Sequence, residues 1–186
     1  NKIKIMNISS NVKKIGKNVF KNCDIIIQCK YGSAIYKYAV NNKIPYELTD
    51  VVKKGMTTSQ KNIKYIVTSV KASNRTVAIT GVLNKNVSSI NIPGTIKING
   101  KTYKVTAVAD RAFKNNKKLT KITIGKNVKK IGNSAFANCT KLTAITLGGQ
   151  VQTIGKSAFS GCTKLAKLTL GKKVKTIDRK AFYGCK

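Results

Sequence analysis

The C-terminal part of the chain alternates apolar and polar residues in a pattern that returns every 23 residues. In "KLTKITIGKNVKKIGNSAFANC", residues 118–139, the apolar Leu119, Ile122 and Ile124 end in the period-two alternation of a strand. After Gly125 the unit ends in Ala-Phe-x-x-Cys, whose apolar residues have the spacing of one helical turn. Each unit therefore predicts a short strand, a bend and a half-helix.

Three such units follow one another at 118–140, 141–163 and 164–186, and a further copy occupies 2–23. A unit of this length is too small to bury its own apolar residues, so it must stack on its neighbours. Stacking places equivalent strands ~4.8 Å apart in a parallel ladder and aligns the repeated phenylalanines inside. We expect a β-rich α/β solenoid built from coils of 23 residues.

The unit "LTxIxIGxxVxxIGxxAFxxC" resembles the BspA-like, or treponemal, class of leucine-rich repeat, which ends in the same Ala-Phe-x-x-Cys element. The resemblance is close over 118–186 and good over 2–23. It implies an α-containing closing cap over 25–48 and a β-hairpin opening cap over 65–113. In the latter, "KINGKTYKV" places Asn99-Gly100 between two alternating strands, a strong signal for a hairpin.

These caps divide the chain into four segments. Residues 1–48 are interpreted as the last coil and closing cap of a first array, and 49–62 as a linker. Residues 63–117 are interpreted as the opening cap leading into the first coil of a second array, and 118–186 as three repeats. Two departures from the pattern, Asp178 in place of a glycine and Asn116 in place of a cysteine, are expected to alter local turns only.

The sequence holds 37 Lys and Arg against 5 Asp and Glu, a formal charge of +32, which attracts polyanions at low salt. Only Arg75, Arg111 and Arg179 are arginines, however, and base and phosphate recognition favours the bidentate guanidinium. We therefore do not expect nucleic acid as the partner. No segment approaches the ~20 apolar residues of a membrane span, so none is expected in this chain.

The sequence contains few residues that carry catalytic chemistry. Histidine and tryptophan are absent and the five acidic residues are scattered, so we expect no enzymatic activity and no cofactor. Cys139, Cys162 and Cys185 occupy one position on successive coils, where the ~4.8 Å strand spacing exceeds the ~3.8 Å between Cβ atoms of a disulfide. They are predicted to be reduced and buried, and their spacing is not that of a zinc site.

The candidate binding face lies on the strands of the coils, where the side chains that point away from the core form a row. Its predicted members are Lys121, Thr123, Thr146, Lys167 and Thr169. Solenoids commonly bind partners on such faces, although stacked threonines are equally explained as good strand formers. Lysines on the turns, such as Lys129 and Lys130, are interpreted as a solvated face.

The resemblance implies a non-enzymatic protein at the cell surface or secreted, which binds host matrix proteins or other cells. The alternative is a lysine-rich binder of anionic polymers: cell-wall polymer, glycosaminoglycan or nucleic acid. A further expectation is head-to-tail self-association, in which the last coil of one chain stacks on the first coil of another. The residues expected in that contact are Leu168 and Leu170 on one side and Ile3, Met6 and Ile8 on the other.

Overall fold

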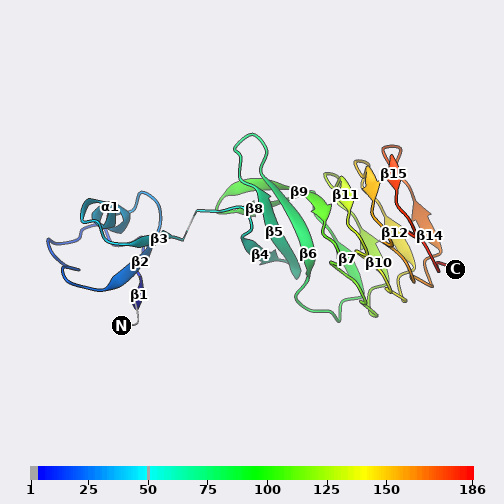
Figure 1. The fold of residues 1–186 in the computed structure, drawn as a ribbon, viewed down its shortest axis with the longest axis horizontal. Helices are drawn as coiled ribbons and strands as arrows, with labels where there is room; N and C mark the ends of the chain where they lie inside the picture. The colour runs from blue at the N-terminus through cyan, green and yellow to red at the C-terminus, as the bar shows by residue number, and fades with distance from the viewer. Residues whose placement is uncertain (1–3, 50) are drawn as a thin grey trace. The chain divides into compact units, whose positions relative to one another are not determined.

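The structure is a computed structural model that describes residues 4–49 and 51–186. The chain divides into two compact units, Asn1–Val52 and Lys53–Lys186, here called unit 1 and unit 2 (Figure 1). The strands of each unit pair within it, and each unit has its own buried residues. The two are described separately below.

Unit 1 combines a parallel sheet with one helix. The strands β1 (Lys4–Asn7), β2 (Ile25–Cys29) and β3 (Tyr46–Leu48) pair in the order β1-β2-β3, and α1 covers Ala34–Asn41. The helix begins after Ser33, whose Oγ accepts a hydrogen bond from the Tyr36 N–H (3.2 Å), as a good N-cap does. Its Ile35 and Ala39 pack against the buried face of β2. This is the helix expected in the closing cap.

Unit 2 begins with a set of longer strands. They are β4 (Thr57–Gln60), β5 (Ile63–Ser69), β6 (Thr76–Val82), β8 (Thr95–Ile98) and β9 (Lys101–Val108). Strands β4, β5 and β6 pair antiparallel in sequence, β6 pairs parallel with β9, and β8 pairs antiparallel with β9. Asn99 and Gly100 join β8 to β9 with φ of 47° and 73°, so the predicted two-residue hairpin is confirmed.

Strand β4 falls inside the segment interpreted as a linker, 49–62, so the ordered part of unit 2 starts earlier than the sequence indicated. Its sequence, "TTSQ", has no apolar alternation because β4 is an edge strand whose side chains are half-buried or exposed. Pairing with β5 through the backbone holds it in place. A hydrophobic pattern cannot reveal a strand of this kind.

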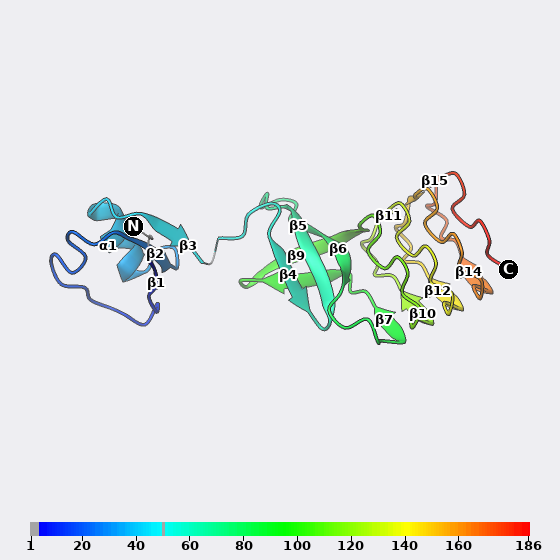
Figure 2. The same cartoon turned by 60° about the horizontal axis from the view of Figure 1, so that its bottom comes forward.

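The coils of unit 2 carry two parallel ladders. The first ladder is β14-β12-β10-β7, with bounds Ser89–Asn91 (β7), Lys121–Thr123 (β10), Ala144–Thr146 (β12) and Lys167–Thr169 (β14). The second runs β15-β13-β11-β9, with bounds Lys130–Ile131 (β11), Thr153–Ile154 (β13) and Thr176–Ile177 (β15). The two ladders lie on opposite sides of the stack (Figure 2). The predicted solenoid is confirmed, and the second ladder is an addition to it.

The half-helix expected in each coil is wrong: the Ala-Phe-x-x-Cys segment consists of turns. Ser134 and Asn138 adopt φ of 51° and 59°, and such left-handed residues interrupt a right-handed helix. The backbone N–H of Phe136 donates to the carbonyl of Ala158 in the next coil (2.7 Å), not four residues back. The segment therefore bonds across coils, which a helix would prevent.

The interior is ordered by a stack of phenylalanines. The rings of Phe113, Phe136, Phe159 and Phe182 are nearly parallel, and successive centroids are 5.1, 5.2 and 5.3 Å apart. The two central rings are fully buried. Centroid distances slightly above the ~4.8 Å strand spacing fit the offset stacking that aromatic rings prefer.

The two departures from the repeat leave the ladders intact. Asp178 replaces a glycine, and its N–H still donates to the carbonyl of Ile154 (2.9 Å). Asn116 replaces a cysteine, and its Oδ1 accepts from the N–H groups of Lys118 (3.0 Å) and Leu119 (3.1 Å). Both residues therefore change local bonding without changing the fold.

We expect Phe136→Ala to lower the free energy of unfolding of unit 2 by about 3–5 kcal/mol, because it leaves a cavity between two stacked rings. Urea unfolding followed by far-UV circular dichroism measures the effect. The matched control is Tyr183→Ala, whose ring is 67% exposed and whose loss should cost little. Equal effects of the two substitutions would contradict a structural role for the stack.

Candidate functional site

The outer side of the first ladder is a continuous surface made by four strands, here called the ladder face. One row holds Ser89, Lys121, Ala144 and Lys167, and the other holds Asn91, Thr123, Thr146 and Thr169. Between the rows, Ile90, Ile122 and Ile145 point inward and are buried. The structure therefore brings all five predicted site residues onto one surface, with neighbours in a row one strand spacing apart (~4.8 Å).

Sequence reasoning missed Ser89 and Asn91, which extend both rows onto β7. The signal was present, because "SINI" at 89–92 has the same alternation as "KITI" at 121–124. The two segments are 32 residues apart, not 23, since the β8–β9 hairpin is inserted between them. An alignment at a fixed period therefore passes over β7.

The threonine hydroxyls on the ladder face differ in hydrogen bonding from those just before the strands. The hydroxyls of Thr120 and Thr143, just before the strands, donate to the carbonyls of Ser88 (2.8 Å) and Thr120 (3.1 Å). Those of the threonines on the ladder face have no hydrogen-bond partner within the described part of the chain. The face therefore presents hydroxyls that are available to a ligand.

The ladder face ends at a hollow beneath the opening cap. The hollow has a volume of about 650 Å³, and Asn91 lines it together with Pro93, Thr95 and Lys97 from the hairpin and Gln60 and Lys61 from β4 and its turn. Gln60 closes one side by donating from Nε2 to the carbonyl of Lys97 (2.6 Å). Tyr65 also lines the hollow, and burial raises its pKa to about 12. A ligand on the face thus has a concave end to enter.

Exposed lysines form a stripe on the turns and the second ladder, here called the lysine stripe. Its members are Lys126, Lys129, Lys130, Lys172, Lys173 and Lys175. The intervening coil is neutral at the equivalent positions, with Gly149, Gln150, Gln152 and Thr153, and Gln150 accepts from Lys173 Nζ (2.9 Å). Skipping a coil sets the lysine groups about 10 Å apart, near the screening length at physiological salt. The arrangement lessens repulsion instead of concentrating charge.

The cysteines form an internal ladder of weak hydrogen bonds. The Sγ atoms of Cys139, Cys162 and Cys185 donate to the phenylalanine carbonyl of the preceding coil, at 3.2, 3.1 and 3.3 Å. Cys23, Cys139, Cys162 and Cys185 are free thiols, and Cys29, Cys139 and Cys162 are buried. Cys185 is only half-buried, which corrects the expectation that all three ladder cysteines are buried. The neighbouring Cys139 thiol and burial raise the pKa of Cys162.

The acidic and thiol side chains of the described residues do not form a metal site. Within residues 4–49 and 51–186, no three of Cys, Asp and Glu lie close enough to hold a metal ion. The carboxylate of Asp110 accepts from the Asn133 N–H (2.8 Å), and Asn133 Oδ1 accepts from the Lys156 N–H (2.9 Å). These side chains thus link successive coils. Among the described helices, none has the length and apolarity needed to cross a membrane.

Comparison with known families agrees with the coil geometry. The model of the BspA-type leucine-rich repeat region matches residues 1–103 and 84–186, with six copies. The chain belongs to the BspA-type leucine-rich repeat family. In this chain, the parallel strands, the Phe stack and the cysteine ladder make up the core of the leucine-rich repeat coils. The family is generally a non-enzymatic repeat scaffold.

Solved structures of leucine-rich repeat proteins resemble this chain. A leucine-rich cell surface protein from Faecalibacterium prausnitzii A2-165 is 31% identical over 71% of the chain, with a TM-score of 0.61. The Leucine Rich Repeat protein of T. pallidum is 26% identical over 70%, with a TM-score of 0.52, and 68% of that protein is covered. The pneumococcal vaccine antigen PcpA is 27% identical over 72%, with a TM-score of 0.51.

The chain spans 35% of the F. prausnitzii protein and 43% of PcpA. It therefore corresponds to a part of these leucine-rich repeat proteins. No curated protein matches the sequence.

We expect five thiols per chain to react with a thiol reagent after unfolding without reductant, and fewer to react in the folded protein. Cys23 is exposed and should react first, whereas burial and a raised pKa protect Cys162. Titration with Ellman's reagent, with and without urea, measures both numbers. Cys23→Ser is the control that should remove the fast phase. Fewer than five thiols after unfolding would mean that a disulfide forms.

Proposed function

We propose that this leucine-rich repeat segment is a non-enzymatic binding module at the cell surface or outside the cell, and that the ladder face contacts a protein partner there. The observation that carries the proposal is the row of unpaired threonine hydroxyls on three successive strands, β10, β12 and β14, which Asn91 extends onto β7. Such a row offers donors and acceptors at a regular spacing on a rigid sheet. A preorganised surface of this kind loses little entropy on binding.

The related structures support the location. One is described as a leucine-rich cell surface protein and another as a pneumococcal vaccine antigen. A host matrix protein or another cell is the partner that best fits a protein so placed. The partner would lie along the ladder face and reach the hollow next to Asn91.

The corresponding surface of unit 1 has different chemistry, which assigns the proposed binding to unit 2. Ile5 on β1 is 60% exposed, and Gln28 Nε2 on β2 donates to Glu47 Oε2 on β3 (3.0 Å). The hydrogen bond between them leaves these two polar side chains less available to a ligand. Unit 1 therefore lacks an equivalent row of available hydroxyls among its described residues.

The lysine stripe favours the second candidate function, binding of an anionic polymer such as a cell-wall polymer or a glycosaminoglycan. The sequence charge of +32 supports such attraction at low salt. The spaced lysines and the scarcity of arginine indicate an unspecific field, because they provide no bidentate contact. This function ranks below protein binding for that reason.

We expect the triple substitution Thr123→Ala, Thr146→Ala, Thr169→Ala to weaken binding to a purified matrix protein about tenfold or more, because several hydrogen bonds are lost together. Surface plasmon resonance against a panel of purified matrix proteins measures the affinities. The matched control is Thr153→Ala with Thr176→Ala, which removes threonines from the second ladder. Unchanged affinity of the triple variant at physiological salt would remove the ladder face from the proposal.

Salt dependence separates the two candidate functions in the same assay. Binding to heparin through the lysine stripe should fall by orders of magnitude between low and physiological salt, since it depends on counterion release. Binding to a matrix protein through the ladder face should change far less. A matrix interaction as steeply salt-dependent as the heparin interaction would favour the lysine stripe.

Self-association through the coil ends stays a prediction. Leu168 is half-buried and Leu170 is 42% exposed at the open side of β14, while Met6 is 40% exposed and Ile8 half-buried in the first coil. Ile3 lies outside the described residues. An unpaired strand edge flanked by apolar side chains favours stacking of a second copy.

We expect the mass measured by light scattering to rise above 20.2 kDa with protein concentration, and Leu170→Lys to suppress the rise because it places a charge in the contact. Leu83→Lys is the matched control, since Leu83 is 59% exposed in a loop of the opening cap. A monomer at every concentration would show that the coil ends do not associate.

A further inference from the structure

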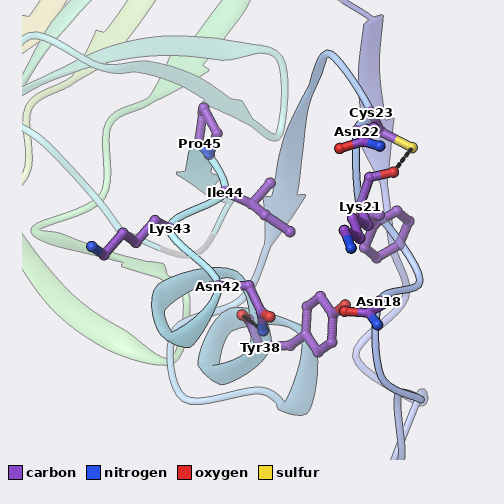
Figure 3. Close-up of a pocket in the computed structure, with 10 residues that line it drawn as sticks. Asn18, Lys21, Asn22, Cys23, Tyr38, Asn42, Lys43, Ile44 and Pro45 are labelled. Carbon is purple, nitrogen blue, oxygen red and sulfur yellow. Dashed lines mark hydrogen bonds between the residues drawn. The ribbon is translucent and has the colours of Figure 1, made fainter.

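A pocket of about 340 Å³ lies in unit 1 between the turns of the first coil and the cap that follows it. One wall consists of residues 18 and 20–23, and the other of Tyr38 and residues 42–45 (Figure 3). Figure 3 shows the Tyr38 ring beside Asn18 and the Ile44 side chain pointing toward the opposite wall. The Tyr38 ring also packs edge-on against Phe20, with centroids 5.9 Å apart, so the base of the pocket is fixed.

The turns of unit 2 show what this wall does elsewhere in the molecule. In each coil that another coil follows, three alternate N–H groups donate to three alternate carbonyls of the next coil. For the central coil the bonds are Ser134 N to Lys156 O (2.9 Å), Phe136 N to Ala158 O (2.7 Å) and Asn138 N to Ser160 O (2.7 Å). The same triple occurs from Arg111, Phe113 and Asn115 to the coil that follows. The turn thus presents a row of three backbone N–H donors to the following coil, here called the donor row.

The first coil of unit 1 has the same donor row, at Asn18, Phe20 and Asn22, but no acceptors opposite it among the described residues. Asn18 and Asn22 have φ of 58° and 59°, matching Ser134 and Asn138, and Phe20 holds the position of Phe136. After this coil the chain forms α1 in place of another turn segment. Within the described residues, the N–H groups of Asn18, Phe20 and Asn22 have no hydrogen-bond acceptor. The pocket is lined by these three residues, next to donors that a following coil pairs in unit 2.

The residues around the donor row of unit 1 are positively charged. Lys21 and Lys43 stand on the two walls, and no acidic residue lines the pocket. Asn42 donates from Nδ2 to the Tyr38 carbonyl (2.8 Å), which anchors that side chain and leaves the wall rigid. Backbone N–H groups that converge around left-handed residues form concave sites for anions. Donors without acceptors and the positive charge of Lys21 on the same wall therefore complement the same type of ligand, whereas the Lys43 side chain points away from this wall in Figure 3.

We propose that this pocket binds an oxyanion, a carboxylate or a phosphate group carried by a ligand of the protein. The oxyanion accepts hydrogen bonds from the N–H groups of Phe20 and its neighbours, in place of the carbonyls of a following coil. Lys21 supplies the charge on the wall of the donors, and Lys43 adds positive charge on the other wall. The pocket lies in unit 1 and the ladder face in unit 2, so this proposal stands independently of the proposed adhesion function.

Titration with sodium phosphate and with sodium acetate, at constant ionic strength set by sodium chloride, tests the proposal in the full chain. Amide chemical shifts are followed by ¹H–¹⁵N correlation spectroscopy. We expect saturable shifts of the Asn18, Phe20 and Asn22 amides with at least one of the two anions. The amides of Ser134, Phe136 and Asn138 are the internal control and should not move, because their acceptors are in place.

Charge removal provides the second arm. Lys21→Gln should weaken the binding about three- to tenfold, since it removes one charge-assisted contact, and Lys43→Gln should weaken it less, because that side chain points away from the donors. Lys17→Gln is the matched control, because Lys17 is exposed in the same coil and does not line the pocket. A response to phosphate alone identifies a phosphoryl ligand, and a response to acetate identifies a carboxylate. Absence of saturation with both anions at tens of millimolar, or equal effects of all three variants, would overturn the proposal.

Discussion

The hydrogen bond from each coil to the next is the constraint on which this structure depends. In the turns, donors such as Phe136 N–H reach across to Ala158 of the following coil, and the strands do the same along both ladders. A coil must therefore present its backbone polar groups up and down the stack and not within itself. That requirement explains the left-handed residues, the absence of helix from the turns, and the small residues wherever two backbones meet. At Gly148, for example, a Cβ would clash with the carbonyl oxygen of Gly125 in the preceding coil.

The sequence predicts what is periodic and misses what is held by backbone bonds alone. The Phe stack and the Asn99-Gly100 hairpin follow directly from spacing and turn chemistry, and both are present. The second ladder was not predicted, because strands of two residues such as β11 are too short for an alternating pattern. The turns were predicted as a half-helix because Ala135, Phe136 and Cys139 have a helical spacing. The left-handed φ of Ser134, which interrupts a helix, cannot be read from the spacing of apolar residues.

The candidate site divides in the same way. Thr123, Thr146 and Thr169 could be placed on one surface from the repeat, since an alternating strand fixes which side chains point outward. Their lack of hydrogen-bond partners could not, because it depends on where the neighbouring carbonyls lie. The hollow beside Asn91 depends on packing of the opening cap, which has no period. A repeat thus predicts the rows of a face, whereas its ends depend on the caps.

The middle coil carries no charge at the positions of the ladder face and the lysine stripe, which has a consequence for how such an array can change its length. Sterically, the coils are interchangeable: removing 141–163 would let the Phe136 and Phe182 rings meet as consecutive rings do now. Electrostatically they are not, because the same deletion would set Lys121 beside Lys167 and Lys129 beside Lys175, and like charges directly opposite on neighbouring strands are destabilising. Gain or loss of whole repeats by recombination is therefore constrained by the order in which charged and uncharged residues occupy the same surface position on successive coils, even where the buried residues are of the same type.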